Sequence, residues 1–343
     1  MKRSCRLRST EEVKLIATPY ETRTQVESDE PVRRRRLLEG GIGTRSEAFG
    51  PVEWALLAGI GLIWGSSFFL IDIALEAFRP GVITAGRVIL GATALSLLPA
   101  ARRPIEREDL PRAAFLGVIW IGIPLSLFPI AQLWIDSSVA GMLNGAMPLA
   151  TAAWSALLFR RAPARVQVAG LVVGFVGVVA ISWAQLQGSE ATLLGTVLVL
   201  AAITLYGLAA NIAVPLQQRY GALPVLLRSQ LAALVIVIPF GLFHLPGSHW
   251  SGEAALAVIP LGALGTGLAF ALMATLVGRV GGPRGSVAIY FVPLVAMALG
   301  ALVLDEDIAR SAMAGTALVI TGAWLTSRRD RSQSNGVPQA ASG

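Results

Sequence analysis

Long apolar stretches separated by short polar gaps follow one another from residue 54 to residue 326. Ten such stretches can be distinguished, each with about 20 predominantly apolar residues, which as a helix crosses a hydrocarbon core of about 30 Å. A helix satisfies its own backbone hydrogen bonds and is therefore stable in lipid. The pattern predicts an all-α integral membrane protein with ten transmembrane helices. The stretches cover residues 54–74, 80–98, 113–133, 137–159, 166–183, 193–214, 223–243, 254–276, 285–304 and 311–326.

The composition agrees with a membrane protein and excludes several kinds of chemistry. Hydrophobic residues make up 54% and charged residues only 14% of the chain, whereas about a quarter of the residues in soluble domains are charged. The single cysteine, Cys5, lies in a polar tail, and the two histidines, His244 and His249, share one hydrophilic gap. These residues supply neither a disulfide framework, nor a metal cluster, nor a Ser/His/Asp hydrolase site. We therefore expect no metal, no cofactor and no enzymatic activity.

The net charge of +7 comes largely from arginines dispersed among the short gaps, which argues against a nucleic-acid partner. These arginines concentrate in alternate gaps and in both tails, a distribution typical of cytoplasmic segments. We predict cytoplasmic termini, with a disordered tail at residues 1–53 and a second tail at residues 327–343. The arginine run at 33–36 either binds anionic lipid headgroups or acts as a topology anchor. The alternate gaps carry Arg102, Arg103, Arg107, Arg112, Arg160, Arg161, Arg165, Arg219, Arg279 and Arg284.

The two halves of the chain share a spaced pattern that indicates an internal duplication. Pro148 is followed by glycines 22 and 29 residues later, and Pro293 is followed by glycines at the same two offsets. Five spans per unit is an odd number, so the second unit must enter the membrane from the opposite side. We predict two inverted five-helix repeats, residues 54–184 and 185–326. Inverted repeats suit alternating access, although duplication for packing alone is the other interpretation.

Two arginines lie within predicted spans, Arg87 in the second and Arg228 in the seventh. An intramembrane arginine costs several kcal/mol unless it is hydrated or paired, which makes each a candidate for substrate binding. A guanidinium facing a central cavity can hold a carboxylate or phosphate in a bidentate manner. The alternatives are a structural ion pair and a side chain that extends to the nearer interface.

Two prolines, Pro148 and Pro293, fall near the middle of predicted spans. Each removes a backbone donor and frees the carbonyl four residues earlier, in Asn144 and Ile289. Together with the side chains of Asn144 and Tyr290, these carbonyls are expected to bind polar groups of a substrate. A kink that serves helix packing is the alternative.

Aromatic and hydrogen-bonding side chains within the first and sixth spans provide the groups that a pocket for a small organic molecule needs. Packing between helices or against lipid is the alternative for each of them. The candidates are Trp64, Ser66, Ser67, Tyr206 and Asn211.

Carboxylates are missing from the middle of every predicted span, so no buried acidic proton relay is evident. Asp72, near the end of the first span, is the nearest substitute if it pairs with Arg87. Coupling to protons or to a counter-substrate therefore stays open. Gly170 and Gly174 form a GxxxG pair in the fifth span, which favours either close helix approach or a homodimer.

The run Trp64-Gly65-Ser66-Ser67-Phe68, the arginine in Gly86-Arg87-Val88, the two Pro-Leu pairs at 148–149 and 293–294, and the glycine-rich fifth and tenth spans resemble the EamA family of the drug/metabolite transporter superfamily. The resemblance covers residues 54–326 and implies the ten-helix inverted-repeat fold, the bacterial inner membrane and export of amino acids or related metabolites. A glutamate that is common after the fourth and ninth spans is present as Glu306, but Arg161 takes the corresponding place in the first half.

From these features we predict a secondary transporter that exports a small polar or amphipathic metabolite by alternating access. Its partners are then a small-molecule substrate and the lipid bilayer. The alternatives are a membrane sensor or scaffold without flux, and a membrane enzyme acting on lipid substrates. The enzyme would need clustered acids or histidines, which the spans do not supply.

Overall fold

The computed structural model describes residues 50–159, 165–186, 190–280 and 286–326. All described residues belong to one compact unit of the chain. In these four ranges the chain consists of helices and short connections, without a β-strand. The predicted all-α fold is thus confirmed, whereas the two predicted tails, apart from residues 50–53, lie outside the described residues.

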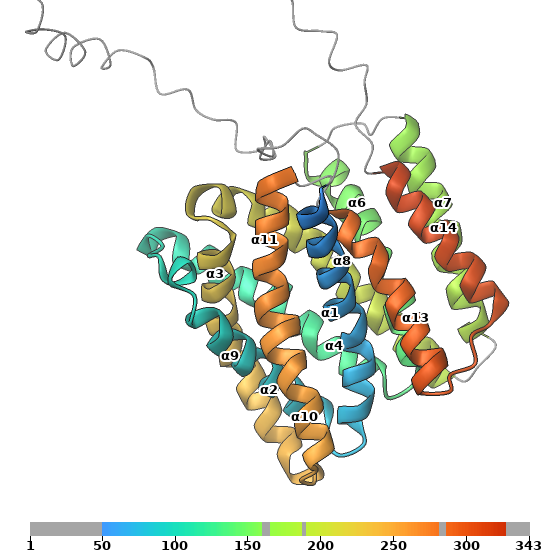
Figure 1. Cartoon of the computed structure of the whole chain (residues 1–343), viewed down its shortest axis with the longest axis horizontal. Coiled ribbons are helices and arrows are strands. Elements are labelled where there is room, and N and C mark those ends of the chain that lie inside the picture. Colours follow the sequence, from blue (N-terminus) through green and yellow to red (C-terminus); the bar gives the residue numbers. More distant parts are fainter. Residues whose placement is uncertain (1–49, 160–164, 187–189, 281–285, 327–343) are drawn as a thin grey trace, which may run out of the picture. The chain divides into compact units, whose positions relative to one another are not determined.

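Helices follow each of the ten predicted apolar stretches, as Figure 1 illustrates. Several stretches are divided into consecutive helical segments. The first half contains α1 (Pro51–Leu75), α2 (Pro80–Ser96), α3 (Leu110–Leu116), the π-helical η3 (Gly117–Gly122), α4 (Ile123–Ala131), α5 (Ser137–Asn144), α6 (Met147–Phe159) and α7 (Arg165–Leu186). The second half contains α8 (Glu190–Tyr220), α9 (Ala222–His244), α10 (Gly252–Pro260), the π-helical η5 (Leu261–Leu268), α11 (Ala269–Val280), the 3-10 helix η6 (Ser286–Tyr290), α13 (Phe291–Val303) and α14 (Arg310–Thr326).

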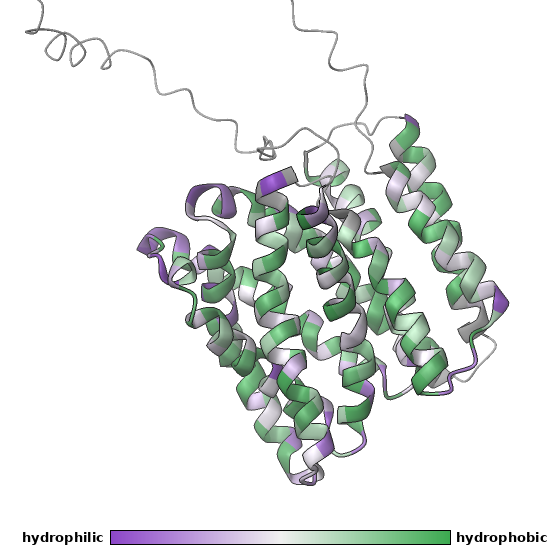
Figure 2. Ribbon diagram, in the orientation of Figure 1, coloured by the Kyte–Doolittle hydropathy of each residue, from purple (hydrophilic) through white to green (hydrophobic). Residues whose placement is uncertain are grey.

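Hydrophobic residues dominate along the helices, while hydrophilic residues gather at helix ends and in the connections (Figure 2). Many large hydrophobic side chains are exposed. Phe243 and Leu302 are each 81% exposed, which is unfavourable in water and favourable against lipid tails. Five helical segments in the described part of the chain are long and apolar enough to cross a membrane, and three shorter apolar helices accompany them. The chain is a multi-pass membrane protein, and the count of ten complete crossings stays a prediction.

Helix contacts repeat when the two halves are exchanged, as a duplicated fold requires. The second helices of the halves, α2 and α9, pack together, and α2 contacts η5 just as α9 contacts η3. The same exchange relates the α1–α13 contact to the α8–α6 contact. The π-helical segments η3 and η5 also occupy the same place, in the third span of each half.

The repeated glycines lie where α7 and α14 pack along their length, side by side in Figure 1. A Cβ atom on Gly177 would lie 2.7 Å from the Gly315 carbonyl oxygen, and one on Gly315 would lie 2.7 Å from the Gly177 carbonyl oxygen. Further along, Gly322 meets Gly170 and Gly174, so the two helices run antiparallel. The GxxxG pair therefore serves close helix approach within the chain, and the predicted homodimer loses its support from this motif.

Pro148 and Pro293 do not interrupt continuous helices, contrary to the expectation from the sequence. The fourth stretch breaks after Asn144, and Pro148 is the second residue of α6. Pro293 is the third residue of α13, directly after η6. A proline in the first turn of a helix removes a donor that has no intrahelical partner in any case. The breaks themselves, rather than prolines within a helix, give these two spans their shape.

Candidate functional site

Arg87 of α2 is the centre of a polar cluster between the two halves. Its side chain is only 6% exposed, and its Nε atom donates a hydrogen bond to Oγ1 of Thr266 in η5 at 2.8 Å. No carboxylate of the described residues forms an ion pair with it. A guanidinium carries five N–H donors and a positive charge. The cluster therefore holds a cation without a counter-ion among the described residues, and Arg87 keeps donors for a ligand.

Gln230 of α9 adds an acceptor to the same cluster. Its Nε2 atom donates to the Thr266 carbonyl oxygen at 2.7 Å, which fixes the amide next to the residue that Arg87 contacts. The Gln230 side chain is fully buried, and its Oε1 atom has no donor among the described residues. A buried acceptor without a donor costs about 1–3 kcal/mol, and a ligand with an N–H group would remove this cost.

The π-helical geometry of η5 positions these groups. Thr266 Oγ1 lies 3.3 Å from the carbonyl oxygen of Leu261, five residues earlier, and Trp64 of α1 donates from Nε1 to the Gly265 carbonyl oxygen at 3.0 Å. A side chain on Gly265 would come within 3.1 Å of Ser67 Oγ and 3.8 Å of an Arg87 terminal nitrogen. Single π-helical turns occur frequently at functional sites because they widen the helix and redirect side chains and carbonyls.

Aromatic rings from several helices surround this polar cluster. The Phe270 ring packs edge-on against Trp64 at 5.3 Å and against Trp120 at 5.8 Å. The Tyr206 ring lies 5.9 Å from that of Phe128. Such rings offer a wall for the apolar part of a small molecule, while the few polar groups set its orientation.

Four of the residues singled out in the sequence meet here: Trp64, Ser67, Arg87 and Tyr206. Sequence reasoning missed Gln230 and Thr266. The available signal was a polar side chain within an otherwise apolar stretch, which for Gln230 also lies two residues after Arg228.

The other predicted residues lie elsewhere. Arg228, at the start of α9, donates to the carbonyl oxygens of Arg102 and Arg103 at 3.4 Å each, and so fixes the connection that follows α2. Ser66 donates to the Ile63 carbonyl within α1, and Asn211 donates to the carbonyls of Thr151 in α6 and Gly207 in its own helix.

Asn144, Pro148, Tyr290 and Pro293 belong to the two broken spans. Asn144 ends α5, and Tyr290, which is buried in the apolar core, ends η6. A Cβ atom on Gly145 would lie 2.6 Å from Cγ of Pro293, so the break in one half packs against the proline of the other. The structure thus shows Pro293 in a packing position at this break.

Asp72 does not pair with Arg87 either. It lines a separate pocket of about 470 Å³ with Glu76, Asp136 and Glu306. Glu306 accepts hydrogen bonds from the backbone amides of Ser137 and Ser138 at 2.9 Å each, and so caps the start of α5. The sequence expectation of an Asp72–Arg87 pair is therefore wrong.

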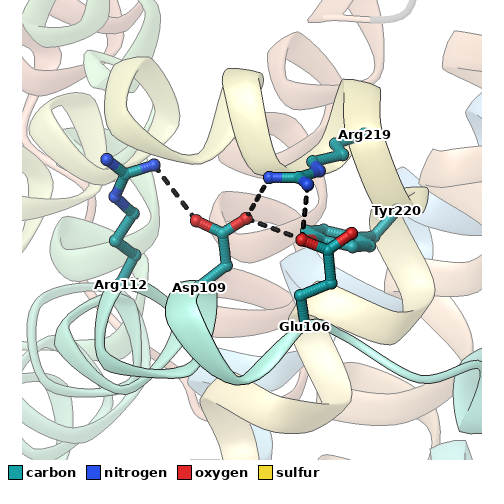
Figure 3. Close-up of polar contacts among 5 residues, drawn as sticks. All are labelled: Glu106, Asp109, Arg112, Arg219 and Tyr220. Carbon is teal, nitrogen blue, oxygen red and sulfur yellow. Dashed lines mark hydrogen bonds and ion pairs between the residues drawn. The ribbon is translucent and has the colours of Figure 1, made fainter.

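A network of charged residues joins the halves where α3 begins and α8 ends (Figure 3). Asp109 accepts from Arg219 and from the Tyr220 hydroxyl at 2.8 Å each, and also pairs with Arg112 at 3.1 Å. Arg219 additionally pairs with Glu106 at 2.5 Å. At the start of α1, Glu53 pairs with Arg279 of α11 at 2.6 Å.

Comparisons with known proteins connect this arrangement to transport. The model of the EamA-like transporter family matches residues 53–183 and 193–328, once in each half. The chain is 23% identical to an uncharacterized transporter of Archaeoglobus fulgidus, covering 81% of this chain and 99% of the relative. It is 26% identical to a probable terminal-alkyne amino-acid exporter of Streptantibioticus cattleyicolor, covering 80% and 93% respectively.

A further relative is a probable amino-acid metabolite efflux pump of Salmonella typhimurium, 24% identical over 77% of this chain and 91% of the relative. Among solved structures, one crystal structure matches with a TM-score of 0.57 and 18% identity, covering 81% of this chain and 99% of that protein. This likeness supports the fold.

Proposed function

This chain belongs to the EamA-like transporter family, and from that premise we propose that it exports an amino-acid-like metabolite across the bacterial inner membrane by alternating access. Two of its relatives are named as a probable terminal-alkyne amino-acid exporter and as a probable amino-acid metabolite efflux pump. In this proposal the protein moves its substrate unchanged, without catalysis.

The pairing of Arg87 with Gln230 carries the proposal. A substrate carboxylate would accept bidentate hydrogen bonds from the free donors of Arg87, while a substrate ammonium group would donate to Gln230 Oε1. Both side chains are held by Thr266, through its hydroxyl and its carbonyl respectively. The α-carbon of an amino acid carries these two groups side by side, and the surrounding rings would contact its side chain.

The repeat architecture supports the transport mode. Residues 54–184 and 185–326 would act as the two inverted units, with the Arg87 cluster between them and both termini in the cytoplasm. The ion pairs of Asp109 and Arg219 join the units at the end rich in arginine. This end would be cytoplasmic, and the network would open when the site faces inward. Coupling to protons or to a counter-substrate is compatible with this scheme.

The deciding test compares amino acids exported by cells that express the wild type, Arg87→Ala or Arg87→Lys at matched membrane levels. Mass spectrometry of medium and cytosol should detect a compound exported by the wild type and lost in Arg87→Ala. Lys at this position should recover export only partly, because an ammonium cannot form the bidentate pair.

Arg228→Ala serves as the matched control, since it also removes one arginine near a span, at a loop contact. It should retain most export. Equal export by the wild type and Arg87→Ala would refute the role of Arg87.

A further inference from the structure

A polar pocket separate from the Arg87 cluster lies at the other end of α1 from the Glu53–Arg279 pair. Glu53 is in the first turn of α1, while Asp72 is in its last turn and Glu76 follows directly. The pocket of about 470 Å³ lies between this end of α1, the connection from α4 to α5 and the segment after α13. None of its lining residues is among those that hydrogen-bond to Arg87, Thr266 or Gln230.

Four carboxylates face this pocket: Asp72, Glu76, Asp136 and Glu306. No basic side chain of the described residues forms an ion pair with any of them. Glu306 is engaged in capping α5, whereas the other three have no hydrogen-bond partner for their side chains in the described part of the chain. The pocket therefore concentrates negative charge that the protein does not neutralise.

Asp136 reflects this crowding. Its burial, and the neighbouring negative charges of Glu306 and Asp307, raise the pKa of its carboxyl group above the ordinary value. A cation in the pocket would relieve the repulsion among these groups.

Gln132 is an independent sign of a missing ligand. Its side chain is 7% exposed and lines the pocket, and its Nε2 atom donates to the Phe68 carbonyl oxygen at 2.9 Å. With the amide held in this way, Oε1 is left as a buried acceptor without a donor among the described residues. Buried acceptors are nearly always paired, so this atom indicates a donor that enters from the pocket.

The remaining lining favours an organic cation over a bare metal ion. Within the described ranges, no three acidic, histidine or cysteine side chains are arranged to hold a metal. Trp134 and three aliphatic residues complete the wall, and an indole ring attracts an ammonium group through its face. We propose that this pocket binds the ammonium group of an organic amine or amino acid, with the carboxylates and Gln132 Oε1 as acceptors.

This site is separate from the Arg87 cluster and would receive the amino end of a ligand at the face opposite the arginine-rich end. It does not rest on Arg87, so the two proposals fail independently. The probe is phenethylammonium, whose neutral counterpart 2-phenylethanol has the same ring and a hydroxyl in place of the ammonium group.

Calorimetric titration of the full chain in lipid nanodiscs at neutral pH provides the test. The wild type should bind phenethylammonium and not 2-phenylethanol. Asp136→Asn and Asp72→Asn should each weaken binding about tenfold, and Gln132→Leu should weaken it as well. Glu253→Gln, which removes an exposed carboxylate at the start of α10 outside the pocket, is the matched control and should bind like the wild type.

Arg87→Ala should also retain this binding, even if it abolishes export. Size-exclusion profiles identify variants that misfold. If one of the two aspartate variants misfolds, the other still tests the contribution of the carboxylates to binding. Equal affinity of both aspartate variants and Glu253→Gln, loss of binding in a folded Arg87→Ala, or equal binding of 2-phenylethanol would overturn the proposal. The proposal would also be overturned if sodium chloride inhibited the binding of phenethylammonium at a concentration equal to that of phenethylammonium itself. That result would assign the pocket to inorganic cations.

Discussion

At the scale of single residues, the central cluster combines a cationic donor with a neutral acceptor in an apolar environment. Arg87 is nearly buried and Gln230 fully buried, and each keeps polar atoms that the described residues leave unpaired. Maintaining such groups in a membrane costs free energy. A substrate with both complementary groups would remove this cost when it binds, whereas a neutral analogue would leave the polar groups unpaired. The site would therefore select zwitterions over neutral analogues.

The acceptor role of Gln230 leads to a prediction about selectivity. Gln230→Leu should raise the KM for export of an amino acid by about tenfold, the factor that corresponds to roughly 1.4 kcal/mol for one hydrogen bond to a charged group. The deaminated analogue of the same compound, with hydrogen in place of the amino group, has no N–H donor, so its KM should change little. Competition assays in vesicles with both compounds would measure the difference.

Ser229→Ala is the control for this experiment, because the neighbouring hydroxyl is equally buried but donates to the Ala113 carbonyl, away from Arg87. If Gln230→Leu affects the amino acid and its deaminated analogue to the same extent, Gln230 has a structural role instead.

At the scale of helices, interruptions and close contacts determine how the spans meet. The π-helical η5 presents Thr266 and the Gly265 carbonyl to residues of α1, α2 and α9. The breaks at 145–146 and before α13 let the fourth spans of the halves pack together. The glycines of α7 and α14 bring two backbones into contact, and small residues are what close approach in a membrane requires.

Packing of α7 against α14 should therefore be sensitive to a single methyl group. Gly177→Ala places Cβ 2.7 Å from the Gly315 carbonyl oxygen, closer than atoms can approach, so the helices must separate. We expect the thermal unfolding temperature in detergent to fall by several degrees, as a loss of about 1–3 kcal/mol from overpacking implies.

Gly59→Ala offers a matched comparison in another span, since its Cβ would lie 3.9 Å from the nearest side-chain atom, Leu272 Cδ1. It should leave the unfolding temperature nearly unchanged. Equal effects of both substitutions would show that the α7–α14 contact is not specifically tight.

At the scale of the whole molecule, ion pairs connect the halves at the end where α8 finishes. Arg219 of the second half pairs with Asp109 and Glu106 of the first half (Figure 3), whereas Arg112 pairs with Asp109 within one half. Arg219 is 53% exposed, so its ion pairs contribute modestly to stability. A modest contribution suits a contact that, in the proposed transport cycle, would break and re-form each time.

Removing this connection should favour opening at that end. In Arg219→Ala, hydrogen exchange of α3 and of the last turns of α8 should accelerate up to about fivefold, the factor that roughly 1 kcal/mol provides. Arg112→Ala should change exchange much less, because Arg112 does not link the halves. Mass spectrometry of both variants measures the effect, and identical exchange in the two would contradict a closing role for Arg219.

The long apolar stretches alone determined the all-helical membrane fold, because lipid requires each crossing segment to be apolar and to satisfy its own backbone hydrogen bonds. The spaced Pro-Leu and glycine pattern indicated the two repeats, because duplication leaves the same spacing in both halves. Arg87 was also predictable, since a charge within an apolar span is conspicuous whatever surrounds it.

Only the tertiary structure decided which residues meet Arg87. Thr266 and Gln230 come from the other half of the chain, so no local pattern connects them to Arg87. Asp72 was considered as the nearest carboxylate to Arg87, and Arg228 was selected as a charge within a predicted span. Helix packing places Asp72 in an acidic pocket and Arg228 against a loop, because side-chain partners depend on which helix faces are brought together.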